Sequence, residues 1–287
     1  MSGLVAPPVW HPPSSGSSDT RFAHVVKSAT LRTAGTYDAV LVGEPYATGR
    51  DAPATTTTVF RESLARLSID LGGRRLEASV GDLGDVGISP DGSDLARVQA
   101  AVRRFTRRVY DRGAVPVFFG SDSALTVPNA RPLLETGSLG VVSFAPTRSG
   151  PDPPVGSRPH EELQRAGLEA LAIVGPRARE SSTGCYDYLR NQVEHVVPAG
   201  VVERDPAAAL LDALSALGPV DEIFVSLDLT LLSTARTGRR NAQEAAAQDT
   251  GIDSEPVEQM LERLARTGRV AAFEVVAPAE TIAANGE

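Results

Sequence analysis

Cysteine and histidine are scarce in this sequence of 287 residues. The single cysteine, Cys185, excludes an internal disulfide and any metal site built from several cysteines, and it is typical of a reducing cytoplasm. The four histidines lie far apart and form no HxH or HExxH spacing, so these common metal-binding motifs are absent. We therefore expect a cytoplasmic protein without a cysteine-based metal centre.

Positive charge and long apolar runs are also lacking. The chain has 28 Lys and Arg residues against 36 Asp and Glu, which gives a net charge of −8 and argues against a nucleic-acid or anionic-membrane partner. No apolar run approaches the roughly 18 residues that a membrane-spanning helix needs. The N-terminal stretch lacks the basic start of a secretory signal and is interrupted by prolines. We expect a globular protein, because hydrophobic residues make up 41% of the chain, enough for a sizeable core.

Short apolar runs alternate with amphipathic stretches of helical length from residue 38 onward. Strands are expected at 38–43, 76–86, 115–120, 139–144, 170–175, 193–198, 222–229 and 270–276, and helices at 58–69, 93–113, 125–136, 160–168, 205–217 and 255–266. Nearly continuous apolar runs indicate strands buried on both faces, hence a mostly parallel sheet of about eight strands between two helical layers. We predict an irregular N-terminal arm over residues 1–36 and a single three-layer α/β domain over residues 37–287.

Ligands of such folds bind beyond the carboxyl ends of the strands. Acidic and hydroxyl residues stand at these ends: Asp82, Asp85, Asp122, Ser143, Ser226, Asp228, Thr230 and Glu274. Each of them could serve a ligand, and each could equally cap a helix or bind loop amides.

Four segments carry a further resemblance: "FFGSDSALT", "VVSFAPTRS", "VSLDLTLLST" and "AAFEVVAPAE". Their order and separation resemble the four active-site motifs of the ureohydrolase family, which comprises arginase, agmatinase, guanidinobutyrase and formimidoylglutamase. "VLVGEPYATG", "DLGDVGIS" and "LAIVGPR" resemble further family segments, so that the likeness spans about residues 38–280. It implies the three-layer αβα fold of arginase.

Active members of that family hold two metal ions, usually manganese, between two histidines and four aspartates, and the ions activate a bridging hydroxide. Carried over to this sequence, the six ligand positions hold Ser123, Ala145, Thr147, Ser149, Asp228 and Thr230. A supporting Asp falls at Ser233, the proton-shuttling His near Gly156 (four residues before His160), and the substrate-facing Glu at Ala277. One retained carboxylate lacks the charge to hold two dications. We therefore expect no metal cofactor and a vestigial pocket without a confident catalytic residue, formed by Asp122, Ser123, Ala145, Thr147, Ser149, Asp228, Thr230 and Glu274.

The resulting hypothesis is a catalytically degenerate ureohydrolase homologue, a pseudoenzyme that serves as an assembly or regulatory subunit or binds a small-molecule ligand. Because family members form trimers and hexamers, we expect a homo-oligomer of that kind or a hetero-oligomer with an active paralogue.

Alternatives remain open. One is a repurposed, metal-independent enzyme, with Ser123, Thr147 or Cys185 as candidate nucleophiles. Another is a residual agmatinase- or arginase-type hydrolase of a guanidino or related C–N compound. A third is a small-molecule sensor or carrier. Five arginines in the two loops that would frame the pocket either form a solvated rim or favour an anionic ligand: Arg148, Arg158, Arg236, Arg239 and Arg240.

Overall fold

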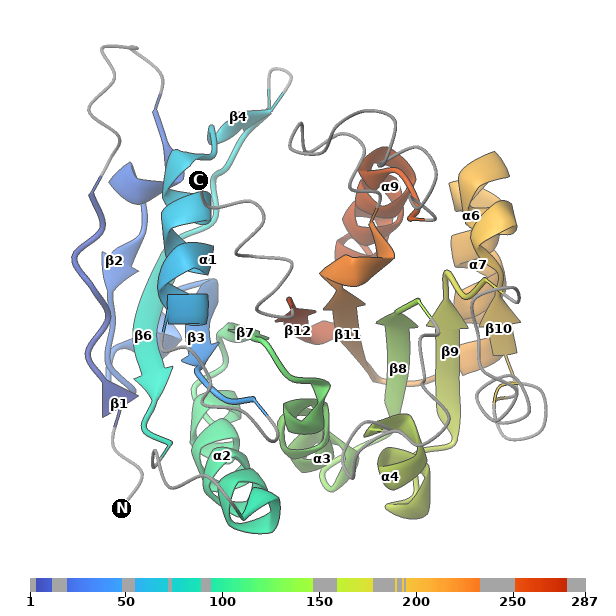
Figure 1. Ribbon diagram of the computed structural model, residues 1–287, viewed down its shortest axis with the longest axis horizontal. Coiled ribbons are helices and arrows are strands. Elements are labelled where there is room, and N and C mark those ends of the chain that lie inside the picture. Colours follow the sequence, from blue (N-terminus) through green and yellow to red (C-terminus); the bar gives the residue numbers. More distant parts are fainter. Residues whose placement is uncertain are drawn as a thin grey trace.

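A ten-stranded sheet forms the centre of the computed structural model, which describes residues 4–11, 20–47, 55–71, 74–88, 94–146, 159–177, 189, 193, 195–232 and 251–277. Its strands are β1 (Leu4–Val5), β2 (Lys27–Ser28), β3 (Ala39–Glu44), β6 (Val80–Val86), β7 (Val115–Gly120), β8 (Leu139–Phe144), β9 (Ala170–Val174), β10 (His195–Val197), β11 (Glu222–Asp228) and β12 (Val270–Val276). The order is β1-β6-β3-β7-β12-β11-β8-β9-β10, with β2 also paired to β6 (Figure 1). All pairings are parallel except that of β1 with β6, so the expected mostly parallel sheet is confirmed.

The sheet has more strands than expected because the N-terminal segment, predicted to be irregular, supplies β1 and β2. Both lie beside β6 and are two residues long, too short to show any alternation in the sequence. A separate hairpin joins β4 (Asp70–Leu71) and β5 (Arg74–Arg75).

Six of the described helices overlap the expected stretches, and a seventh, over residues 199–204, was not expected. They are α1 (Thr55–Arg66), α2 (Leu95–Tyr110), α3 (Thr126–Leu134), α4 (Pro159–Arg165), α6 (Ala199–Arg204), α7 (Pro206–Leu217) and α9 (Ser254–Ala265). Short 3-10 turns are η1 (Phe22–His24), η2 (Ala34–Thr36), η3 (Ser123–Leu125) and η5 (Leu229–Leu231). Asp94 caps α2 and Asp205 caps α7, since their carboxylates accept from the amides of Arg97 and Ala208.

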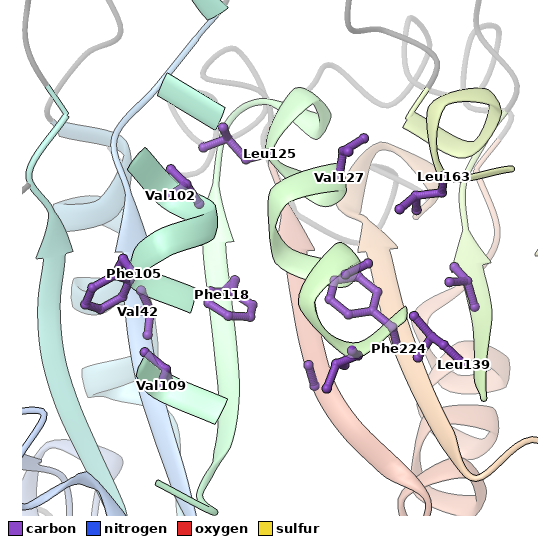
Figure 2. Packing of buried hydrophobic residues seen from close by; sticks show 14 of the residues in the cluster. Val42, Val102, Phe105, Val109, Phe118, Leu125, Val127, Leu139, Leu163 and Phe224 are labelled. Atoms are coloured by element: carbon purple, nitrogen blue, oxygen red, sulfur yellow. The ribbon is translucent and has the colours of Figure 1, made fainter. Parts of the chain in front are cut away.

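Helices α2, α3 and α4 cover one face of the sheet. The buried side of α2 presents Val102, Phe105 and Val109 toward Val42 of β3 and Phe118 of β7 (Figure 2). Further along the sheet, Val127 of α3 and Leu163 of α4 join the same cluster with Leu139 and Phe224 (Figure 2). Burial of these apolar side chains, worth about 25 cal/mol per Å², is what holds the helices in place.

The opposite face is covered by α6, α7 and α9 over strands β8 to β12, and by α1 over β3 and β7. Phe60 of α1 stacks on Phe119 of β7 with ring centroids 4.5 Å apart. The sheet therefore lies between two helical layers, and Figure 1 shows α2, α3 and α4 on the lower side of the view and α1, α6, α7 and α9 on the upper side. Within the described ranges, no helix is long and apolar enough to cross a membrane.

The face beneath α2 and α3 changes character along the strands. Because side chains alternate between the two faces of a strand, residues two apart share a face. In β3 the apolar Val40 and Val42 are followed by Glu44, and in β11 the buried Phe224 is followed by Ser226 and Asp228. The carboxyl end of this face is therefore polar, and there the candidate site lies.

Candidate active site at the carboxyl ends of the strands

Two aspartates mark the loops that follow β7 and β11. Asp122 precedes η3, and its carboxylate accepts from the backbone amide of Ala124 at 2.9 Å. Asp228 precedes η5, and its Oδ1 accepts from the amide and the hydroxyl of Thr230 at 2.8 and 2.7 Å. Both carboxylates therefore stabilise a turn at a strand end, which is the structural role considered for them from the sequence.

The strand register places these turns along one edge. Gly120 pairs with Val276 and Val276 with Asp228, so Gly120 and Asp228 stand two strand spacings apart. At about 4.8 Å per spacing, their backbones lie about 10 Å from one another. Ser123 begins η3 next to Asp122, and Thr230 lies within η5, so both predicted hydroxyls accompany the two aspartates.

Glu274 lies two residues before the end of β12, on the face of the sheet beneath α3. It is 2% exposed, and its carboxylate accepts three hydrogen bonds, from the hydroxyls of Thr126 at 2.7 Å and Ser226 at 2.8 Å and from the Asn129 amide at 3.1 Å. Burial raises the pKa of Glu274, the three hydrogen bonds oppose this shift, and the charge of Asp122 adds to it. Asp122 and Glu274 are thus coupled electrostatically between the edge and the interior.

Glu44, at the end of β3, faces the same buried layer. Its Oε2 accepts from Nδ2 of Asn129 at 2.9 Å, so that one amide group lies between two glutamates. Burial, and after it the charge of Glu274, raises the pKa of Glu44 well above its usual range, against the opposing hydrogen bond from Asn129. Sequence reasoning missed Glu44 and Asn129. Glu44 could have been found from its position as the charged residue that ends the apolar run "AVLVGE". No pattern in the sequence indicated Asn129.

The predicted strand-end residues Asp82 and Asp85 do not join this layer. Arg61 of α1 binds Asp82 through two nitrogens at 2.8 and 3.0 Å and Asp85 through a third at 2.7 Å. Trp10 and the amide of Gly84 also donate to Asp82. These two aspartates therefore have a structural role, because both bind Arg61 on the other side of the sheet.

The remaining predicted positions divide between described and undescribed segments. Ala145 follows β8, where its amide donates to Val174 at 3.0 Å, and Ala277 is buried after β12, donating to Gly120 at 2.9 Å. The half-buried His160 lies in α4, which rests against α3 and η3, and burial lowers its pKa to about 4. Other predicted positions lie outside the described residues: Thr147, Ser149, Gly156, Cys185, Ser233 and the five loop arginines.

The described residues do not by themselves match a dinuclear metal site. Among them, no three side chains of the His, Cys, Asp or Glu type gather closely enough to hold a metal ion. One carboxylate oxygen of Asp228 accepts from the backbone amide and the hydroxyl of Thr230. The family's ligand positions at Thr147 and Ser149 lie outside the described ranges.

Comparisons of the sequence and of the fold with known proteins all find proteins of the arginase family. The sequence model of the arginase family matches residues 37–283. Formimidoylglutamase of Halobacterium salinarum is 36% identical over 288 residues, covering 96% of this chain and 92% of that protein. The crystal structure of formimidoylglutamase from Bacillus subtilis superposes with a TM-score of 0.72 at 16% identity, covering 96% of this chain and 92% of the other. A structure of Trypanosoma cruzi formiminoglutamase with Mn²⁺ gives a TM-score of 0.72 at 20% identity and 90% coverage of both chains.

Two expectations from the sequence are corrected by these findings. The pseudoenzyme hypothesis is wrong, because the relative at 36% identity is named for an enzyme activity, that of formimidoylglutamase. The expectation of no metal cofactor is contradicted as well, since a formiminoglutamase of the same fold was crystallised with Mn²⁺. Both expectations rested on the side chains at six positions placed by motif spacing, and two of these positions, Thr147 and Ser149, lie outside the described residues.

Proposed function

This chain belongs to the arginase family, and we propose that it is an enzyme that hydrolyses a C–N bond in a linear amidine, with a formimidoyl amino acid as its first candidate substrate. The observation that carries the proposal is the 36% identity to a formimidoylglutamase across 96% of this chain. Similarity of that extent includes the strands and the turns at their carboxyl ends, where ligands of this architecture bind.

The candidate substrate has two chemically different ends. Its formimidoyl group is an amidine and carries a positive charge at neutral pH, whereas a glutamate portion carries two carboxylates. Asp122 and Asp228, at the edge of the sheet, are suited to the cationic end because opposite charges attract strongly where water is partly excluded. The arginines of the loops 145–159 and 230–255 suit the anionic end; they lie outside the described residues, and this part of the proposal rests on the sequence.

The reaction itself adds one water molecule across the amidine carbon and breaks one of its two C–N bonds. Cleavage on the amino-acid side gives formamide and the free amino acid, while cleavage on the other side gives ammonia and a formyl amino acid. The hydroxyl groups of Ser123 and Thr230, next to the two aspartates, are the candidates to hydrogen-bond a substrate nitrogen or the attacking water.

The test is an assay of the purified full chain on N-formimidoylglutamate, agmatine, arginine and guanidinobutyrate, with and without added Mn²⁺. Formamide, free glutamate, ammonia and urea are measured together, so the bond that breaks is identified. We expect turnover of N-formimidoylglutamate above that of the guanidino compounds. Absence of every product under all metal conditions would refute the proposal.

Two matched substitutions locate the activity. Asp228→Asn removes a negative charge at the edge and is expected to lower kcat/KM about 100-fold, the scale of losing one strong charge contact of about 2.7 kcal/mol. Asp253→Asn makes the same chemical change at an exposed residue before α9 whose side chain caps no amide, and full activity is expected. Equal activity of the two variants would show that Asp228 has no part in the reaction.

We also propose an oligomeric state and a cellular location for this chain. We expect a trimer or hexamer, since closed symmetric assemblies are usual for soluble oligomers and were predicted from the family resemblance. Analytical ultracentrifugation of the full chain decides this. A cytoplasmic location is favoured by the single cysteine.

A further inference from the structure

The strongest unexplained feature outside the edge of the site is the pair of buried glutamates joined by Asn129. Glu44 and Glu274 are each 2% exposed, and each accepts from the same Asn129 nitrogen. That nitrogen thereby uses both of its hydrogens, while the amide oxygen of Asn129 accepts from Thr106 at 3.3 Å and its backbone carbonyl from Tyr110 at 2.8 Å. The orientation of the amide is therefore fixed by its neighbours.

The two carboxyl groups differ sharply in the number of donors that they receive. Glu274 accepts three hydrogen bonds, a pattern that stabilises an ionised carboxylate. Glu44 accepts one, and its Oε1 is buried without a hydrogen-bond partner among the described residues. Burying an ionised carboxylate with one oxygen that accepts no hydrogen bond costs much free energy, whereas the protonated form carries no charge and costs less.

No described cation offsets two negative charges here. The titratable groups that interact with the pair from the packed elements are Tyr110 of α2 and Asp122 before η3, which are neutral or acidic, while Glu222 of β11 acts on Tyr110 alone. Arg61 approaches the neighbouring Gly43, but successive residues of a strand face opposite ways, and its guanidinium is bound to Asp82 and Asp85.

We propose that Glu44 and Glu274 share a single proton, carried by Glu44, and that this Asn129-bridged pair is a positioning device for the turn that bears Asp122 and Ser123. One proton lets both side chains stay buried with a single net charge, and the number of donors decides which of them keeps the charge. The location of the proton is independent of which amidine the enzyme hydrolyses.

The link to the turn is short. Glu44 pairs in register with Gly120, and the Glu44 carbonyl lies 2.7 Å from where a Cβ on Gly120 would stand. Next to Gly120, the hydroxyl of Ser121 donates to the carbonyl of Tyr46 at 2.8 Å. Asn129 and Thr126 belong to α3, which continues directly from η3. Ionising Glu44 places two charges on either side of Asn129 and therefore loosens α3 together with the turn before it.

The sign of the pH dependence follows from the raised pKa of Glu44. A carboxyl whose pKa is higher in the folded chain contributes stability that is complete below its unfolded pKa of about 4.3 and is lost as the pH rises through the folded pKa. Replacement by glutamine keeps the shape, removes the titration and supplies an amide hydrogen in place of the acid proton. Glu44→Gln is therefore expected to fold and to melt at a temperature that varies less with pH than that of the unsubstituted chain.

The experiment combines infrared spectroscopy with thermal unfolding for the unsubstituted chain, Glu44→Gln, Glu274→Gln and the control Glu222→Gln, from about pH 6 to about pH 9. The carbonyl stretch of a protonated carboxylic acid is expected near neutral pH in the unsubstituted chain and in the control, and it is expected to disappear in Glu44→Gln. Glu274→Gln is expected to melt lowest, because its amide nitrogen, a donor, must replace one of two carboxylate oxygens that each accept from a donor.

Three results would overturn the assignment of the proton to Glu44. The first is a protonated-acid band that persists unchanged in Glu44→Gln. The second is a melting temperature that depends on pH in Glu44→Gln as it does in the unsubstituted chain, and the third is a lower melting temperature for Glu44→Gln than for Glu274→Gln. The positioning role has its own readout: the alkaline fall of kcat for the amidine substrate shifts to higher pH in Glu44→Gln and is unmoved in Glu222→Gln. An alkaline limb that is identical in both variants contradicts this role and leaves the location of the proton to the infrared result.

Discussion

Replacing Arg61 by methionine removes the cation from a buried group of charges that involves two aspartates of β6. The Arg61 side chain is 3% exposed, and its partners Asp82 and Asp85 are 0% and 19% exposed. The guanidinium makes three hydrogen bonds to these carboxylates and also lies 4.8 Å from the ring centre of Phe119. Methionine keeps the unbranched stem beside Phe119, so that the substitution tests chiefly the charge.

The magnitude follows from what remains after the substitution. Asp82 keeps the hydrogen bonds from Trp10 and from the amide of Gly84, but loses its cationic partner while fully buried. Breaking a buried ion pair from one side costs about 3–5 kcal/mol, since the other charge stays in the interior. We expect a loss in that range, measured as the change in the free energy of unfolding from urea titrations with a common slope.

A matched control is Arg165→Met in α4. Arg165 is paired with Glu161 one helical turn away, and its side chain is 74% exposed. An exposed pair of this kind contributes about 0.3–0.5 kcal/mol, so the two arginine substitutions should differ several-fold. The double variant Arg61→Met with Asp82→Asn should recover part of the loss. A decrease below about 1 kcal/mol for Arg61→Met would refute the reasoning, because the pair would then behave like a surface contact.

Two further substitutions test the packing that supports the site. Gly120→Ala places a methyl group 2.7 Å from the Glu44 carbonyl oxygen, which is backbone and cannot turn away; we expect a lower melting temperature and reduced kcat in the activity assay, and unchanged values would show that β3 and β7 can separate without consequence. Phe224→Ala empties a fully buried position between the sheet and α3 and is expected to cost about 3–5 kcal/mol by urea titration, whereas a loss under about 1 kcal/mol would mean that the core there is not closely packed.

Most helices and strands could be predicted from patterns within short stretches of the sequence. The apolar spacing of α2 depends on residues within a few positions of one another, and the helix forms within the expected stretch. The same holds for α7, where Asp205 caps the helix and Pro206 starts it. Helix α6 and the strands β1 and β2 were not distinguished, because elements of two to six residues show too little periodicity to separate them from loops.

The buried polar layer could not be predicted in the same way. Glu44, Asn129 and Glu274 come from β3, α3 and β12, and 145 positions separate Asn129 from Glu274. Their meeting depends on the strand order β3-β7-β12, which no local pattern encodes. Of the predicted pocket, Asp122, Ser123, Asp228, Thr230 and Glu274 lie at or beneath the carboxyl edge as expected, while their roles stay predictions.

The most direct test of the proposed activity is the hydrolysis of N-formimidoylglutamate by the purified full chain, followed through formamide, glutamate and ammonia, with Asp228→Asn and Asp253→Asn assayed beside it. The proposal predicts that product forms faster from this compound than from agmatine, arginine or guanidinobutyrate, and that Asp228→Asn alone lowers the rate. No product from any of the four compounds, with or without Mn²⁺, would contradict it.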